Sequence, residues 1–161
     1  MRLEFASALR QNHALEHATI SLLVKRLGMG TRLIGQATPG GFVIYGDVPT
    51  QAVEEAVSEG LSRLQRGEAE MAVSPMCGTN LVVAGLLAGI SALAVVGSKN
   101  RLRRLPHALL AAVLAVVAAQ PLGRVVQRHI TTSADLSQVR MARVTRRGRG
   151  RRTLHKIEII R

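Results

Sequence analysis

Two long apolar runs in the second half of the sequence constrain the fold more than any other feature. Residues 81 to 97 contain no charged side chain, and a second run extends from Leu105 to about Val126. The lengths of both runs are close to the roughly 20 residues that a helix needs to cross about 30 Å of hydrocarbon. We therefore expect a two-helix transmembrane hairpin. The alternative, a buried hairpin of a soluble protein, would need a larger shell than 161 residues provide.

The sequence before these runs predicts a small domain of helices and strands. A helical pattern extends from Ala6 to Leu27 and ends at glycine residues. Two short strands are expected at 33–36 and 42–45, joined through a Pro-Gly-Gly turn. A second helix is expected over 51–65, with one apolar face and with Thr50 as its N-cap.

The sequence after the runs predicts a β-hairpin. Val139–Thr145 and Leu154–Ile160 have the composition of strands and flank the segment RRGRGRR. His155, in the second of them, is expected on a surface strand. The fold class is then α+β, a small helix-plus-antiparallel-sheet domain with the transmembrane hairpin inserted before a C-terminal β-hairpin. The expected parts are 1–78, 79–127 and 128–161, the last completing the soluble domain.

The positive charge of the chain is concentrated in two places. The net charge is +12, yet residues 1–78 are nearly neutral; residues 98–107 and 130–161 supply most of the excess. This pattern favours contact with a lipid bilayer and its anionic head groups. The expected contact residues are the arginines of the C-terminal hairpin: Arg146, Arg147, Arg149, Arg151 and Arg152. The start of the chain lacks a signal-peptide pattern, so we expect the soluble parts in the cytoplasm and two spans in the cell membrane.

The segment NHALEHATI contains the main candidate functional residues. His13 and His17 are four residues apart, on one helical face, and Glu16 stands directly before the second histidine. The spacing H-x-x-E-H resembles the helix motif of inverted zincins, which implies zinc-dependent hydrolysis with Glu16 as the general base. Alternatively, His13, Glu16 and His17 form a structural polar cluster.

A membrane hairpin would bring further metal ligands to the same interface. Cys77 precedes the first apolar run and His129 follows the second, so both would lie where the helix with His13 and His17 docks. We expect His129 as a third zinc ligand. Cys77 could take the fourth position and close the site, or the position could stay open for water. Asp47 or Asp135 could orient a ligating imidazole.

Four blocks together resemble a known family: NHALEHATI, GGFVIYGDVPT, CGTNL and QRHITTSAD. They extend from residue 12 to residue 135 and are similar to a family of small bacterial membrane proteins that contain a domain of unknown function. The resemblance implies a protein with two membrane spans and brings no activity with it.

Three classes of function remain open. The first is a membrane-bound zinc hydrolase resembling a metallopeptidase, with a peptide as substrate. The second is a non-catalytic membrane module that binds a protein partner or anionic lipid. The third is nucleic-acid binding through RRGRGRR, but two Phe, one Tyr and no Trp leave almost no aromatic side chains to stack on bases.

Overall fold

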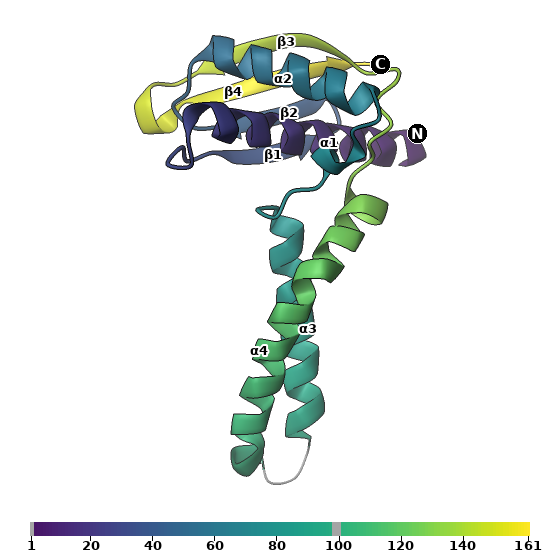
Figure 1. Ribbon diagram of the computed structural model, residues 1–161, viewed down its shortest axis with the longest axis vertical. Coiled ribbons are helices and arrows are strands. Elements are labelled where there is room, and N and C mark those ends of the chain that lie inside the picture. The colour runs from purple at the N-terminus through teal and green to yellow at the C-terminus, as the bar shows by residue number, and fades with distance from the viewer. Residues whose placement is uncertain (1, 98–100) are drawn as a thin grey trace. The chain divides into compact units, whose positions relative to one another are not determined.

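The structure, a computed structural model, describes residues 2–97 and 101–161 (Figure 1), except the side chains of residues 2, 3 and 151. The chain forms two compact units. One contains the residues up to Ser74 together with Arg128–Arg161, and the other contains Pro75–Gln127. Helices and an antiparallel sheet combine in the first unit, which confirms the α+β class.

The first unit is a four-stranded antiparallel sheet with two long helices. Its helices are α1 (Arg2–Leu27) and α2 (Thr50–Gln65), with the short 3-10 turns η1 (Ala69–Ala72) and η3 (Gly150–Arg152). Its strands are β1 (Ile34–Thr38), β2 (Gly41–Tyr45), β3 (Arg140–Arg147) and β4 (Leu154–Ile160). The strand order is β1-β2-β4-β3, so the C-terminal hairpin completes the sheet begun by β1 and β2, as the sequence predicts.

Both helices cover the same face of the sheet (Figure 1). Along β2, Phe42 and Ile44 are buried while Tyr45 is exposed, because successive side chains of a strand point to opposite faces. The buried side chains join Leu15 of α1 and Val57 of α2 in one hydrophobic core. The apolar face predicted for α2 is confirmed.

The centre of α1 is buried almost all round rather than on one stripe. Every residue from Ala14 to Thr19 is buried, and the side chains in the core include Leu15, Ala18 and Leu22. The C-terminal end of the helix is less enclosed, and Leu27 is 42% exposed. The helix packs against α2, β1 and η1, and these neighbours enclose it from several sides.

Two expectations are wrong, namely that Thr50 is the N-cap of α2 and that His155 lies on a surface strand. Pro49 is the N-cap and Thr50 is the first helical residue, and the Thr50 hydroxyl lies 3.3 Å from His155 Nε2. His155 is fully buried, because its side chain points to the helix-covered face of β4. The hydroxyl that was expected to cap the helix instead contacts this buried imidazole.

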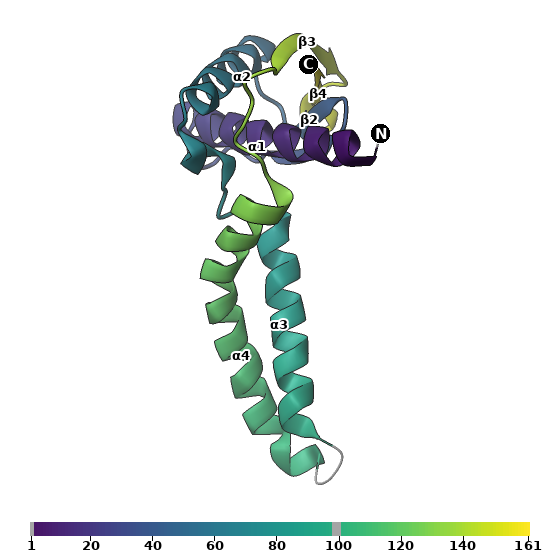
Figure 2. The same cartoon turned by 90° about the vertical axis from the view of Figure 1, so that its right-hand side faces the viewer.

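The second unit is an antiparallel helical hairpin. Helices α3 (Gly78–Val96) and α4 (Arg101–Val126) lie side by side in both views (Figures 1 and 2), and a π-helical turn, η2 (Gln127–Thr131), follows α4. Two helices, Gly78–Val96 and Arg101–Thr131, are long and apolar enough to cross a membrane. The 19 residues of α3 span about 28 Å, close to the roughly 30 Å of a hydrocarbon core.

A polar contact joins the two helices at the end away from their connecting loop. Gln127 Nε2 donates to Asn80 Oδ1 at 2.7 Å, and Asn80 Nδ2 donates to the Pro75 carbonyl at 2.9 Å. Gly123 of α4 packs against Asn80 so closely that a Cβ at position 123 would overlap the Asn80 amide. Asn80 and Gln127 are buried. The hydrogen bond between their amides is stabilising, because a buried polar group without a partner costs free energy.

Candidate metal centre

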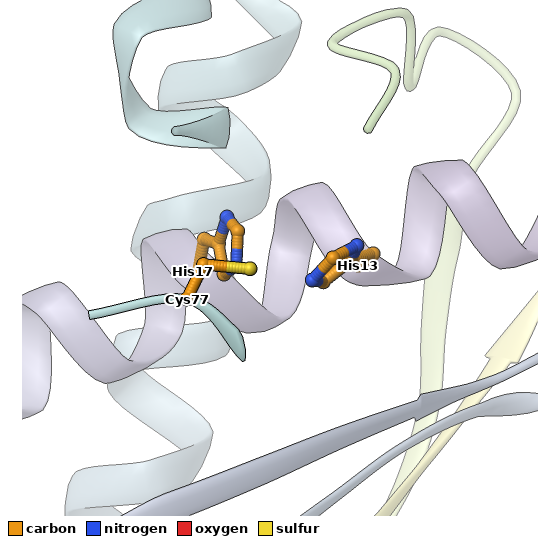
Figure 3. A group of neighbouring side chains, drawn as sticks. All are labelled: His13, His17 and Cys77. Atoms are coloured by element: carbon orange, nitrogen blue, oxygen red, sulfur yellow. The ribbon is translucent and has the colours of Figure 1, made fainter. Parts of the chain in front are cut away.

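Three polar side chains occupy one face of α1. Arg10, His13 and His17 follow the i, i+3, i+7 spacing that places side chains in a row along a helix. Figure 3 shows His13 and His17 on successive turns of this helix. Their ring centroids are 4.4 Å apart, and a ring nitrogen of each lies within 4.8 Å of one on the other. Two imidazoles therefore lie close enough to share one ion.

Main-chain carbonyls fix the orientation and the tautomer of both imidazoles. His13 Nδ1 lies 2.9 Å from the Thr131 carbonyl oxygen, and His17 Nδ1 lies 2.8 Å from the Ala72 carbonyl oxygen. A carbonyl oxygen only accepts, so each Nδ1 must carry a proton and each Nε2 must carry the lone pair. An Nδ1–H bound to a carbonyl is the arrangement that usually orients a metal-ligating histidine.

Glu16 is buried beside His13. Its side chain is 8% exposed, and Glu16 Oε2 lies 3.9 Å from His13 Nε2. The carboxylate reaches this place because Gly35 of β1 has no side chain, and a Cβ there would overlap Glu16 Oε1. The fold therefore provides a specific location for a carboxylate next to the imidazole pair.

Residues 8–144 match a protein family described as a domain of unknown function, DUF6391. The chain belongs to this family. An uncharacterised protein of Picosynechococcus sp. is 37% identical over 142 residues, which cover 80% of this chain and 68% of that protein. No solved structure matches the chain.

The family match confirms the resemblance to proteins that contain a domain of unknown function, while the two membrane spans that the resemblance implies stay a prediction. The match begins at residue 8 and ends at residue 144, so it includes His13, Glu16, His17 and Cys77. The candidate residues therefore lie within the part of the chain that matches the family. Neither the family nor the relative has a described activity, so the chemistry rests on the side chains themselves.

Three other predicted site residues take part in different contacts. The side chain of His129 is exposed, and its carbonyl oxygen accepts a hydrogen bond of 3.0 Å from Arg10. Asp47 pairs with Arg146 at 3.2 Å, beside the buried His155. Asp135 accepts hydrogen bonds from the backbone and the hydroxyl of Ser137, which lower the pKa of its carboxyl. The structure does not join these side chains to the imidazole pair, and their predicted roles there stay predictions.

Cys77 belongs to the second unit, where it is the N-cap of α3. Its Sγ atom accepts a hydrogen bond from the Thr79 backbone at 3.4 Å, and the thiol is not in a disulfide. Cys77 follows Ala72, the partner of His17, by five residues, so their Cα atoms are at most about 18 Å apart. Its predicted place as a fourth ligand stays a prediction.

Sequence reasoning missed Arg10 and Gly35. Arg10 donates to the carbonyls of His129 and Thr132, both at 3.0 Å, and it thereby holds the segment that contacts His13. A signal for Arg10 was available, because it lies three residues before His13 on the same helical face. For Gly35 the signal was an isolated glycine inside a strand, which often marks the close approach of another group.

The arginines predicted to contact anions are in different surroundings. Arg146 is paired with Asp47, whereas Arg147, Arg149 and Arg152 are exposed. The side chain of Arg151 lies outside the described residues. The predicted set is therefore not one uniform patch.

Proposed function

We propose that this protein is an integral membrane protein with a metal centre on α1, where His13 and His17 bind Zn²⁺ and Glu16 is the general base of a hydrolase. The observation that carries the proposal is the pair of Nδ1–carbonyl hydrogen bonds. They leave a lone pair on both Nε2 atoms, which is the form of imidazole that binds zinc, at about 2.0–2.1 Å.

The proposed chemistry is the hydrolysis of a peptide bond. Bound Zn²⁺ would act as a Lewis acid on a water molecule. The Glu16 carboxylate takes a proton from that water, whose oxygen forms a bond to the carbonyl carbon of the substrate. The C–N bond then breaks, and the amine leaves with the proton that Glu16 had accepted. The likeness of HALEH to inverted zincins supports a peptide as the substrate class.

A location in the membrane is supported by the two apolar helices and by the sheet. Strand β2 precedes the helical hairpin and pairs with β4, which follows it. Both ends of the hairpin must therefore be on the same side of any bilayer, and two crossings satisfy this condition. The expected cytoplasmic side of the soluble unit stays a prediction.

Metal analysis of the protein purified in detergent tests the proposal. We expect wild-type protein to retain zinc after dialysis, and His13→Asn and His17→Asn to lose it. His155→Asn, which changes another buried histidine, is the matched control and should keep the metal. Circular dichroism verifies that each variant is folded. Zinc retention by both α1 variants, or loss from the control alone, would exclude this centre.

Two further measurements separate a catalytic from a structural metal centre. Glu16→Gln should keep zinc and abolish cleavage of a fluorogenic casein substrate. Cobalt substitution then tests Cys77, because a thiolate ligand gives an intense charge-transfer band that Cys77→Ser would remove. Such a band means a closed, structural site and contradicts the hydrolase. The absence of the band, together with activity that depends on Glu16, supports the hydrolase.

One observation favours a second candidate, in which the polar row of α1 is structural. The carbonyls that His17 and His13 contact belong to Ala72 and Thr131, and these segments lead into and out of the helical hairpin. In that case the wild-type protein binds no zinc, and each histidine variant loses about 1–3 kcal/mol of unfolding free energy. The module would then act by binding a protein partner or anionic lipid.

A further inference from the structure

The register of the sheet sorts the basic side chains of the C-terminal hairpin onto two faces. Residues directly opposite each other in an antiparallel sheet point to the same face. His155 and Ile157 of β4 are buried beneath the helices, so Leu154, Lys156 and Glu158 point to the other side. We call this side the open face, because its side chains are exposed or half-buried.

A bulge in β3 places three arginines on the open face. The register shifts between Met141 and Arg143, which leaves Ala142 without a partner on β4. A bulge of this kind changes which side chains share a face. As a result, three arginines of β3 stand opposite open-face residues of β4: Arg140 opposite Ile160, Arg143 opposite Glu158, and Arg147 opposite Leu154. Arg146 stands opposite His155, on the helix-covered side, where Asp47 pairs with it.

The open face carries a positive charge that it does not neutralise itself. Lys156 donates to Glu158 at 2.7 Å, and this hydrogen bond is the main reason why the pKa of the Glu158 carboxyl is lowered. The charges of Arg143 and Arg147 lower that pKa further, so both guanidinium groups act on the same carboxylate. One carboxylate thus stands among several exposed cations, and the surplus attracts an anionic surface.

Apolar side chains lie in the same row as Arg147. Ile34, Tyr45, Leu154 and Arg147 are successive partners across all four strands. Ile34 is 71% exposed and Tyr45 is 41% exposed. Exposed apolar groups beside cations are typical of surfaces that rest at the boundary between lipid head groups and acyl chains. Tyrosine is also enriched at this boundary.

We propose that the open face docks on an anionic phospholipid surface, with Arg143 and Arg147 on lipid phosphates and with Ile34 and Tyr45 at the head-group boundary. Arginine matches phosphate oxygens with a fixed fork of donors. The chain's own apolar helices, once in a bilayer, hold this face near such a surface and raise its effective concentration. Single-stranded RNA fits less well, because Tyr45 is the one aromatic of the whole chain that could stack from this face.

The absence of tryptophan from the sequence allows a direct test on the full chain. Tyr45→Trp puts a unique fluorophore in the proposed contact. The protein is reconstituted in nanodiscs of phosphatidylcholine alone or mixed with phosphatidylglycerol. We expect the emission to shift to the blue, and to be quenched by brominated acyl chains, in the anionic discs at low salt. Both effects should disappear at high salt.

Paired charge variants show whether the open face is responsible. In the Tyr45→Trp protein, Arg143→Gln/Arg147→Gln should lower the ratio of docked to undocked protein roughly twenty-five-fold, at roughly five-fold for each cation. The control Lys25→Gln/Arg66→Gln removes two exposed cations from α1 and from the end of α2 and should change little.

Three outcomes would overturn the proposal. The first is equal emission in neutral and anionic discs, and the second is an equal effect of the two charge variants. The third is a response of the tryptophan emission to single-stranded RNA but not to anionic lipid. Thermal unfolding of each variant verifies that the sheet is intact, so that a loss of docking reflects the lost charge.

Discussion

The carboxylate of Glu16 fills the space that a side chain at Gly35 would occupy. One residue supplies a buried acid from α1, and the other supplies the gap in β1 that admits it. The two positions are 19 residues apart in sequence, and the burial of the carboxylate depends on the absence of a side chain at position 35.

Gly35→Ala is therefore expected to destabilise the protein by about 1–3 kcal/mol, because the new methyl group displaces the Glu16 carboxylate. Unfolding in detergent, followed by circular dichroism, measures the change. The cost should shrink in a Glu16→Ala background, where the space is free. Gly30→Ala is the control, since a Cβ there meets no atom within 4 Å. Equal costs of Gly35→Ala in the two backgrounds would contradict the explanation.

The helical hairpin should depend on Gly123 in a similar way. A Cβ at this position overlaps the Asn80 side chain, whose Oδ1 atom accepts the hydrogen bond from Gln127. We expect Gly123→Ala to cost about 1–3 kcal/mol of unfolding free energy in detergent. Gly85→Ala in α3 meets no atom within 4 Å and should be tolerated. If Gly85→Ala proves as harmful as Gly123→Ala, the contact with Asn80 is not the cause.

Stability should decrease in mild acid because of His155. Burial, and then the charge of Arg146, lower the pKa of this imidazole below its ordinary 6.5, while Asp47 opposes the shift. The unfolded chain thus takes up the proton at a higher pH than the folded protein. The stabilising effect is complete above about pH 6.5 and is lost as the pH falls below this value. Denaturant unfolding at several pH values measures it.

His155→Gln should have a flatter dependence of unfolding free energy on pH in the same range. The other four histidines are present in both proteins, so the difference between the two curves belongs to position 155. Parallel curves would show that this imidazole does not titrate differently in the folded and unfolded states.

The hairpin should also behave as an integral membrane segment. We expect the protein to remain with membranes after extraction with alkaline carbonate, since α3 and α4 expose apolar side chains such as Leu93 and Leu109 along their length. Replacement of Leu86 and Ile90, both exposed on α3, by Asp should release it, because each charge in hydrocarbon costs about 2.5–3.5 kcal/mol. The control is the same pair of substitutions at Lys25 and Arg66. Folded monomer in detergent-free buffer would refute the membrane location.

Periodicity and charge were sufficient to predict most of the elements. The end of α1 at Leu27, the end of α2 at Gln65 and the whole of β4 match the expected bounds. The apolar runs predicted both long helices of the hairpin, because a long, mainly apolar segment is stable only where it is buried or in contact with lipid. These patterns are local, so they predict a helix or a strand without knowledge of the tertiary contacts.

Contacts made by the main chain could not be predicted in this way. The carbonyls of Ala72 and Thr131 hold the two imidazoles, yet a carbonyl is common to all residues and leaves no mark in the sequence. The burial of His155 depends on the position of β4 inside the sheet, and the faces of the arginines depend on one unpaired residue, Ala142. A shift of one residue reverses the face of every side chain that follows.

The position of β4 between β2 and β3 has a consequence for biosynthesis. β4 follows every other strand in the chain, so the ribosome delivers both apolar helices before the strand that joins the two halves of the sheet. Until then β2 and β3 lack their common neighbour, and the hydrophobic core lacks Ile157 and Ile159 of β4. Synthesis of both hairpin helices therefore precedes the closing of the sheet, and the first unit can fold completely only after an unrelated segment of the chain has been made.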